Sequence, residues 1–101
     1  MIFIYSIFPN KKAAKRVGKR LVRKRLAACV NIFPMDLIYS WREKIVKEKG
    51  VAVIIKTRKE NFKKIEKFIL KNHPDETPCI LEMPINRVTK KYLHWLNKET
   101  A

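Results

Sequence analysis

Apolar residues open the chain in a pattern typical of a strand. Residues 2–8 are rich in β-branched and aromatic side chains, and the run ends at Pro9-Asn10. Such a run followed by a turn predicts a strand. Because apolar side chains fall on both of its faces, we expect a central strand that is buried on both sides.

A helical pattern follows this strand. We expect the helix to span residues 11–25, with Asn10 as its N-cap and with Gly18 allowing a close approach to the sheet. The residues that recur at the spacing of one helix face are Ala13, Ala14, Val17, Leu21 and Val22. The other face carries Lys and Arg and no acidic residue. That face is either a solvated helix surface or a docking surface for phosphate, and the repeated like charges at i,i+4 spacing favour a test with an anionic partner.

From Ala28 onward the apolar pattern alternates with a period of two, which is typical of strands. The alternation breaks at Pro34, resumes at Leu37, and continues to Trp41. A return strand is predicted from Ile45 to Thr57, so the two strands form a long hairpin. Arg42-Glu43 is a poor match to the Asn-Gly type of tight turn, and the position of the turn is left open.

The predicted hairpin is too long for the domain that carries it. Each arm has about 12 residues and a length of roughly 40 Å. A globule of this chain length is only about 25–30 Å across. The distal half, with Tyr39 and Trp41, should therefore project from the domain, and exposed aromatic strands of this kind favour an obligate oligomer.

The remaining pattern predicts a second helix over residues 58–72, ended by His73-Pro74, and a strand over residues 79–83. Thr89 is predicted to cap a last helix. The apolar stripe of the second helix is Phe62, Ile65, Phe68 and Ile69, and that of the last helix is Tyr92, Leu93, Trp95 and Leu96.

This order of elements is β-α-β-β-α-β with an added C-terminal helix. We predict an α+β fold of the ferredoxin-like type, in which two helices cover one face of an antiparallel sheet. The 101 residues are expected to form a single domain, 1–101. Because no helix remains for the other sheet face, packing between subunits is expected to cover it.

The chain is strongly basic. The chain has 24 Lys and Arg against 9 Asp and Glu, a net charge of +15. A lysine-rich, thermophile-like surface is one interpretation, but the acids are too few to pair with the bases. Non-specific binding of polyanions through the basic helix 11–25 is therefore predicted.

No signal sequence or membrane span is evident, and we expect a cytoplasmic protein whose two cysteines are reduced thiols.

The sequence contains few motifs that indicate catalysis or ligand binding. No Ser/His/Asp set, paired carboxylates or zinc-ligand spacing stands out, and with two glycines a Gly-rich phosphate loop is excluded. An enzyme is therefore not predicted. The segment 73–79 holds imidazole, carboxylate and thiolate groups that suit Cu or Zn, although its two prolines favour a rigid turn. The aromatic residues of the hairpin and the last helix could line a pocket, but core or interface positions are favoured.

The chain resembles the CutA divalent-ion tolerance proteins over nearly its whole length. The segments that carry the resemblance are Arg25-Leu26-Ala27-Ala28-Cys29-Val30-Asn31-Ile32, Tyr39 with Trp41, Ile54-Ile55-Lys56-Thr57, His73-Pro74 with Glu76 and Pro78, and Tyr92-Leu93 with Trp95. Their order and combined spacing make the match specific. The resemblance implies a ferredoxin-like subunit in a tight homotrimer, a hairpin that reaches neighbouring subunits, and a link to copper and other divalent ions. It also implies an architecture similar to that of the PII signalling proteins, and no enzyme activity.

Several positions depart from the family pattern. Arg42-Glu43 follows the hairpin tryptophan in place of Glu-Gly, Asp75 replaces an aromatic residue, Cys79 replaces an acid, and Val88 replaces a glycine. The changes at Asp75 and Cys79 add an oxygen and a sulfur to the loop, so that metal affinity is expected to be altered.

The hypothesis drawn from this resemblance is a non-enzymatic homotrimer that binds a divalent metal, Cu(II) first among candidates, near subunit boundaries. The predicted ligands are Cys29, His73 and Glu76. The predicted residues of an intersubunit cleft are Tyr39, Trp41, Lys56, Tyr92 and Trp95. The alternatives are a PII-like sensor of a small molecule and a basic module that binds nucleic acid.

Overall fold

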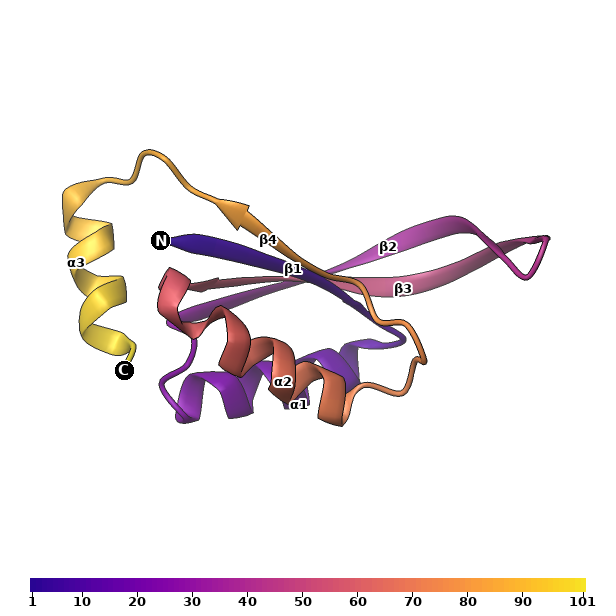
Figure 1. Cartoon of the computed structure of the whole chain (residues 1–101), viewed down its shortest axis with the longest axis horizontal. Coiled ribbons are helices and arrows are strands. Elements are labelled where there is room, and N and C mark those ends of the chain that lie inside the picture. Colours follow the sequence, from indigo (N-terminus) through magenta and orange to yellow (C-terminus); the bar gives the residue numbers. More distant parts are fainter.

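The computed structural model describes every residue from Met1 to Ala101, and its elements follow the predicted order (Figure 1). The elements are β1 Ile2–Phe8, α1 Lys11–Arg23, β2 Cys29–Trp41, β3 Lys44–Thr57, a 3-10 turn Lys59–Asn61, α2 Phe62–Asn72, β4 Ile80–Pro84 and α3 Lys90–Glu99. The four strands form one antiparallel sheet in the order β2-β3-β1-β4, which is the ferredoxin-like arrangement. Helices α1 and α2 lie along one face of this sheet, and α3 stands at its end (Figure 1).

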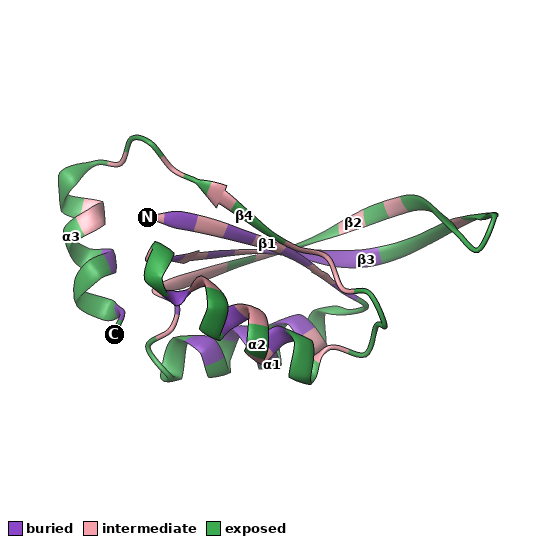
Figure 2. Cartoon of the chain, in the orientation of Figure 1, coloured by how far each residue is buried: buried purple, intermediate pink, exposed green.

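Strand β1 is central but is not buried equally on both sides, contrary to the prediction. Ile2, Ile4, Ser6 and Phe8 are buried, whereas the alternate residues Phe3, Tyr5 and Ile7 are only half-buried. The cluster around them takes Ala14 from α1 and Ile65 from α2. The helices therefore cover one face of β1, and no helix of this chain covers the other (Figure 2).

Helix α1 begins as predicted and ends two residues early. The Asn10 side chain accepts a hydrogen bond from the Ala13 amide at 2.8 Å, which confirms the cap. At the other end Arg25 has a φ of 60°, the left-handed conformation that glycine usually supplies. The amide of Leu26 then bonds to the carbonyl of Leu21 at 3.0 Å, closing the helix in a Schellman motif.

Gly18 has the predicted close contact. A Cβ atom there would lie 3.3 Å from Cγ1 of Val30, so α1 packs directly on β2 at this point. Other boundaries differ from the prediction by small amounts. Residues 59–61 form a 3-10 turn before α2, and β4 begins at Ile80. Thr89 occupies the N-cap position of α3, but its side chain makes no capping bond.

The hairpin is as long as predicted, with 13 residues in β2 and 14 in β3. Its turn is Arg42-Glu43, with φ values of 48° and 66°. Two positive φ values are the requirement of a tight type I′ turn, so the turn forms here in spite of its unfavourable sequence. The molecule measures 45 × 25 × 21 Å, and Figure 2 shows exposed residues along the projecting end of the hairpin. Ile38 and Ile45 are 71% and 69% exposed there.

None of the helices combines the length and the apolar character that crossing a bilayer requires.

Candidate functional site

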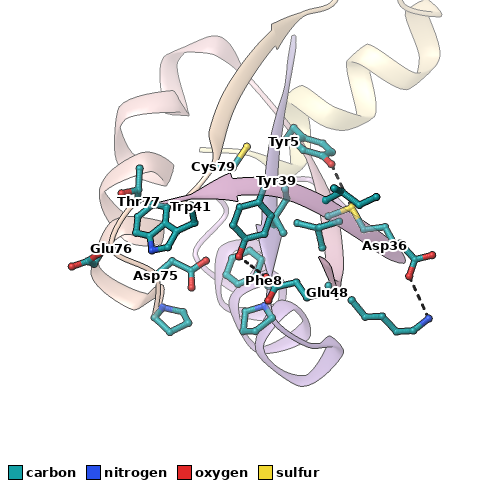
Figure 3. A pocket seen from close by; sticks show the side chains of 18 residues that line it. Tyr5, Phe8, Asp36, Tyr39, Trp41, Glu48, Asp75, Glu76, Thr77 and Cys79 are labelled. Carbon is teal, nitrogen blue, oxygen red and sulfur yellow. Dashed lines mark hydrogen bonds and ion pairs between the residues drawn. The ribbon is translucent and has the colours of Figure 1, made fainter. Parts of the chain in front are cut away.

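A hollow of about 760 Å³ lies between the distal half of the hairpin, the end of β1 and the loop that follows α2 (Figure 3). Its aromatic lining residues are Tyr5, Phe8, Tyr39 and Trp41. Its charged lining residues are Asp36, Glu48, Lys49, Asp75 and Glu76. Four of the nine acidic residues of a strongly basic chain therefore line one hollow. The local charge is the opposite of the net charge, a setting that favours cations.

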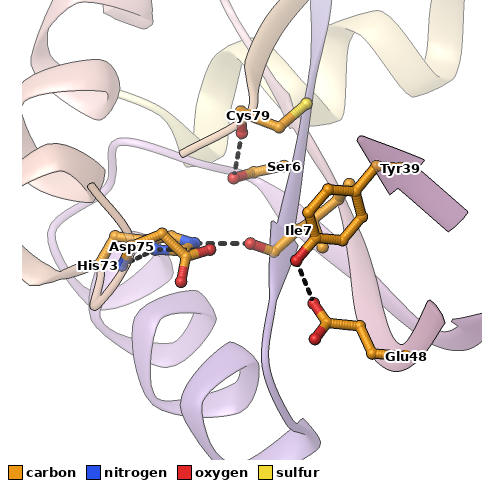
Figure 4. Close-up of polar contacts among 7 residues, drawn as sticks. All are labelled: Ser6, Ile7, Tyr39, Glu48, His73, Asp75 and Cys79. Atoms are coloured by element: carbon orange, nitrogen blue, oxygen red, sulfur yellow. Dashed lines mark hydrogen bonds and ion pairs between the residues drawn. The ribbon is translucent and has the colours of Figure 1, made fainter. Parts of the chain in front are cut away.

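The phenol of Tyr39 bridges the two arms of the hairpin inside this hollow. Its hydroxyl donates to Oε1 of Glu48 at 2.9 Å (Figure 4). This hydrogen bond, a little desolvation, and the negative charges of Glu48 and Asp75 together raise the pKa of Tyr39 above its usual 10.0. Nearby, the Lys49 ammonium lies 3.3 Å from Asp36, and both side chains are exposed.

His73 holds the loop to the end of β1. Its ring is fully buried and lies 4.8 Å from the ring of Phe8. Nε2 is 2.6 Å from the carbonyl of Ile7, and Nδ1 accepts from the amide of Asp75 at 3.0 Å (Figure 4). Since Nδ1 accepts, the proton belongs on Nε2, which donates to Ile7. For His73 to bind a metal ion, one of these two bonds must break.

The other two predicted ligands lie in different surroundings. Glu76 is exposed and pairs with Arg42 at 3.5 Å, joining the loop to the hairpin turn. Cys29 begins β2 and lies opposite Lys56, which in turn lies opposite Phe3 of β1. His73 contacts β1 at Ile7, four residues or roughly 13 Å farther along the strand. In one chain no three side chains of His, Cys, Asp or Glu are grouped to hold a metal, so Cys29, His73 and Glu76 do not converge within a subunit.

The predicted cleft residues also divide into two groups. Tyr39 and Trp41 line the hollow at the hairpin end. The other three gather at the α3 end, where the Lys56 ammonium is 5.7 Å from the ring of Tyr92 and the Tyr92 and Trp95 rings are 5.5 Å apart. Lys56 also lies 5.6 Å from the ring of Phe3, so it is enclosed by two aromatic rings.

Cys79 closes the hollow beside the start of β4. The Ser6 hydroxyl donates to its carbonyl at 2.6 Å (Figure 4). Burial raises the pKa of its thiol, which lowers the thiolate fraction at neutral pH.

The sequence alone did not identify Tyr5, Asp36, Glu48 and Lys49 as residues of this hollow. The missing information was the register of the hairpin. Once the turn is fixed at Arg42-Glu43, Asp36 falls opposite Lys49 and Leu37 opposite Glu48, and the hairpin's part of the charged lining follows from that pairing.

Comparison with known proteins gives a uniform result. The CutA1 divalent ion tolerance protein family matches residues 2–99. The Divalent-cation tolerance protein CutA of Archaeoglobus fulgidus is 42% identical over 95% of this chain and 94% of its own. That of Thermotoga maritima is 40% identical over 97% of each chain.

Solved structures agree with the sequence matches. The structure described as the periplasmic divalent cation tolerance protein CutA from Archaeoglobus fulgidus superimposes with a TM-score of 0.95 at 41% identity, over 98% of both chains. The crystal structure of CutA1 from Pyrococcus horikoshii gives 0.96 at 35% identity, over 100% of this chain and 99% of that one. By sequence and by fold, this chain belongs to the CutA1 divalent ion tolerance protein family.

Proposed function

We propose that this protein is a homotrimer that binds a divalent cation, Cu(II) first among candidates, between its subunits, and that its role is cytoplasmic and non-enzymatic. The observation that carries this proposal is the division of the predicted site into two halves. One half lies at the hairpin end, with Tyr39, Trp41 and Glu76. The other lies at the α3 end, with Cys29 beside Lys56. A second chain is needed to bring such halves together.

The distal half of the hairpin supports assembly because its large apolar side chains are exposed in the single chain. Trp41 and Tyr39 are 41% and 39% exposed, and Ile38 and Ile45 are more exposed still. None of the four belongs to the hydrophobic core. Exposed apolar strands of this length are a hazard in a monomer, and packing against other subunits removes the hazard.

Copper is favoured by the chemistry of the predicted ligands. A thiolate, an imidazole and a carboxylate form a set that suits Cu or Zn better than Ca or Mg. Cys29 and Glu76 can contribute from different subunits, since each is at least partly accessible and Arg42 engages only one carboxylate oxygen of Glu76. His73 would contribute only after losing one of its two hydrogen bonds. We therefore expect Cys29 and Glu76 to contribute more to the affinity for the metal ion than His73 does.

Solution mass tests the assembly. Three chains of 12.0 kDa have a mass of about 36 kDa, which light scattering after gel filtration resolves from a monomer. A monomer at micromolar concentration would refute the trimer.

Calorimetric titration of the metal-free protein with Cu(II) tests the site. We expect binding tighter than about 1 mM that weakens at least about tenfold in Cys29→Ser and in Glu76→Gln. Glu60→Gln is the matched control, because its exposed carboxylate lies in the 3-10 turn, outside the hollow, and should leave the affinity unchanged. No binding in this range, or a loss in Glu60→Gln equal to that in Glu76→Gln, would refute the metal site while leaving the trimer standing.

A small organic ligand is the second candidate, favoured by the aromatic lining of the 760 Å³ hollow. A thermal-shift screen with nucleotides tests it, because a ligand at 100 times its Kd stabilises the folded state by about 2.7 kcal/mol.

A further inference from the structure

The outer face of α1 is a continuous basic surface. Between residues 11 and 25 the chain has nine Lys and Arg and no acid. All nine are exposed, and none of them takes part in an ion pair. Figure 2 shows the exposed residues along the side of α1 that faces away from the sheet. The positive charge of this helix is therefore not balanced by the chain itself.

One side of this surface borders a groove. A second hollow, of about 570 Å³, lies between α1 and β2, the edge strand of the sheet. Its cations are Lys15, Lys19 and Arg23, which follow one another at i, i+4 and i+8 along the rim. Its apolar floor consists of Gly18, Val22, Val30 and Ile32. Because Gly18 has no side chain, α1 sits low on Val30 at the centre of this floor.

The spacing of the rim suits a chain of phosphates. Four residues of helix correspond to a rise of about 6 Å, so Lys15, Lys19 and Arg23 form a row of three positive charges about 6 Å apart. Successive phosphates of an extended nucleic-acid strand are separated by a similar distance. The three residues lie on one helix, so their backbone positions are already fixed when such a strand binds.

We propose that this groove binds the phosphate backbone of a single-stranded nucleic acid without reading its sequence. Sequence reading needs stacking or base-edge contacts, and the groove contains no aromatic side chain. An anionic membrane fits less well, because a membrane-surface helix inserts its apolar face. The apolar face of α1, with Ala14, Val17 and Leu21, is already buried in the core.

The test is the fluorescence anisotropy of a labelled oligouridine of about 16 nucleotides, titrated with the full-length protein. Three phosphate contacts predict a slope of log K against log salt of about −2, or a loss of about 18-fold between 50 and 200 mM salt. The triple variant Lys15→Gln, Lys19→Gln and Arg23→Gln should bind at least about tenfold more weakly and show a slope near zero.

The matched control is Lys90→Gln, Lys91→Gln and Lys98→Gln in α3. It removes the same charge from exposed helical positions and should retain the wild-type affinity and slope. Circular dichroism and solution mass, unchanged in both variants, exclude misfolding as the cause. Equal losses in the two triple variants would overturn the proposal, since net charge alone would then explain binding. Absence of binding at 50 mM salt would overturn it too, as would binding only to vesicles that contain phosphatidylglycerol.

Discussion

His73 shows how a residue with the chemistry of a metal ligand can have a structural role. Its ring nitrogens satisfy the Ile7 carbonyl and the Asp75 amide, and its ring packs on Phe8. The residue type and the His-Pro context suggested a ligand, but neither hydrogen bond is visible in the sequence, because both partners are backbone groups.

Removal of this ring should therefore cost stability whether or not metal is present. His73→Ala removes the partners of the part-buried Ile7 carbonyl and of the Asp75 amide, and opens a cavity beside Phe8. We expect the free energy of unfolding, measured with urea, to fall by about 3 kcal/mol. His94→Ala, at an exposed position, should change it by less than about 0.5 kcal/mol. Equal effects in the two variants would contradict the structural role.

Tyr39 makes a second prediction at this scale. Its hydrogen bond to Glu48 exists only while the phenol is protonated, and its pKa in the folded state is raised above 10.0. The contribution of this bond to stability is thus complete below pH 10.0 and is lost as the pH rises through the higher folded value. Glu48→Gln should move the Tyr39 pKa back toward 10.0, measured by tyrosinate absorbance with Tyr39→Phe as the reference spectrum.

Glu43→Gln is the control for this titration, because Glu43 lies in the turn and makes no bond to the phenol. If Glu48→Gln leaves the tyrosinate curve unchanged, the bond across the hairpin does not form in solution.

Among the elements, α3 is attached to the domain in an unexpected way. Its predicted apolar face has four residues, yet only Leu96 is buried, and Trp95 is 40% exposed. Polar contacts hold the helix instead. The Arg25 guanidinium donates to the carbonyl of Lys98 at 2.6 Å. Arg58 donates to the carbonyl of Asn97 and, at 2.7 Å, to the hydroxyl of Thr100.

This polar attachment gives a prediction for the element. Arg58→Ala removes charged donors from several acceptors of α3, so we expect a loss of about 2 kcal/mol in the free energy of unfolding. Hydrogen exchange should accelerate in residues 90–101 before it does in the sheet. Arg87→Ala is the control, since Arg87 is exposed and makes none of these contacts. Unchanged exchange in Arg58→Ala would show that Leu96 alone holds the helix.

The elements were predictable where local pattern determines them. The period-two alternation specified the hairpin, and Asn10 identified the start of α1, because both signals act over a few neighbouring residues. The end of α1 was not predictable, since Arg25 adopts a φ of 60° while its guanidinium binds α3, more than 70 residues away. That conformation is unfavourable for a residue other than glycine. The hydrogen bond from Arg25 to α3 forms only in the folded tertiary structure, so no local pattern in the sequence indicates it.

Across the whole molecule, charge is distributed unevenly in a way that the net value of +15 conceals. Four acids gather at the hollow beside the hairpin, whereas every charged residue of α1 is a cation. The predicted site residues are likewise divided between two ends of the sheet. The family resemblance suggested these residues without revealing this division, because a motif gives order along the chain and not position in one subunit.

The projecting hairpin gives the last prediction, at the scale of the assembly. Trp41 contacts the Arg42 guanidinium, 5.6 Å from its ring, but lies outside the core cluster. Its truncation should therefore leave the fold of the subunit intact while removing an aromatic anchor from the proposed interface between subunits. A buried interface tryptophan is worth about 2 kcal/mol or more, so Trp41→Ala should dissociate on dilution at concentrations at least about 30-fold higher than the wild type. Leu70→Ala, a 55% exposed side chain on the helix layer, should dissociate as the wild type does. If Trp41→Ala keeps the wild-type mass throughout the dilution series, the hairpin is not the element that joins the subunits.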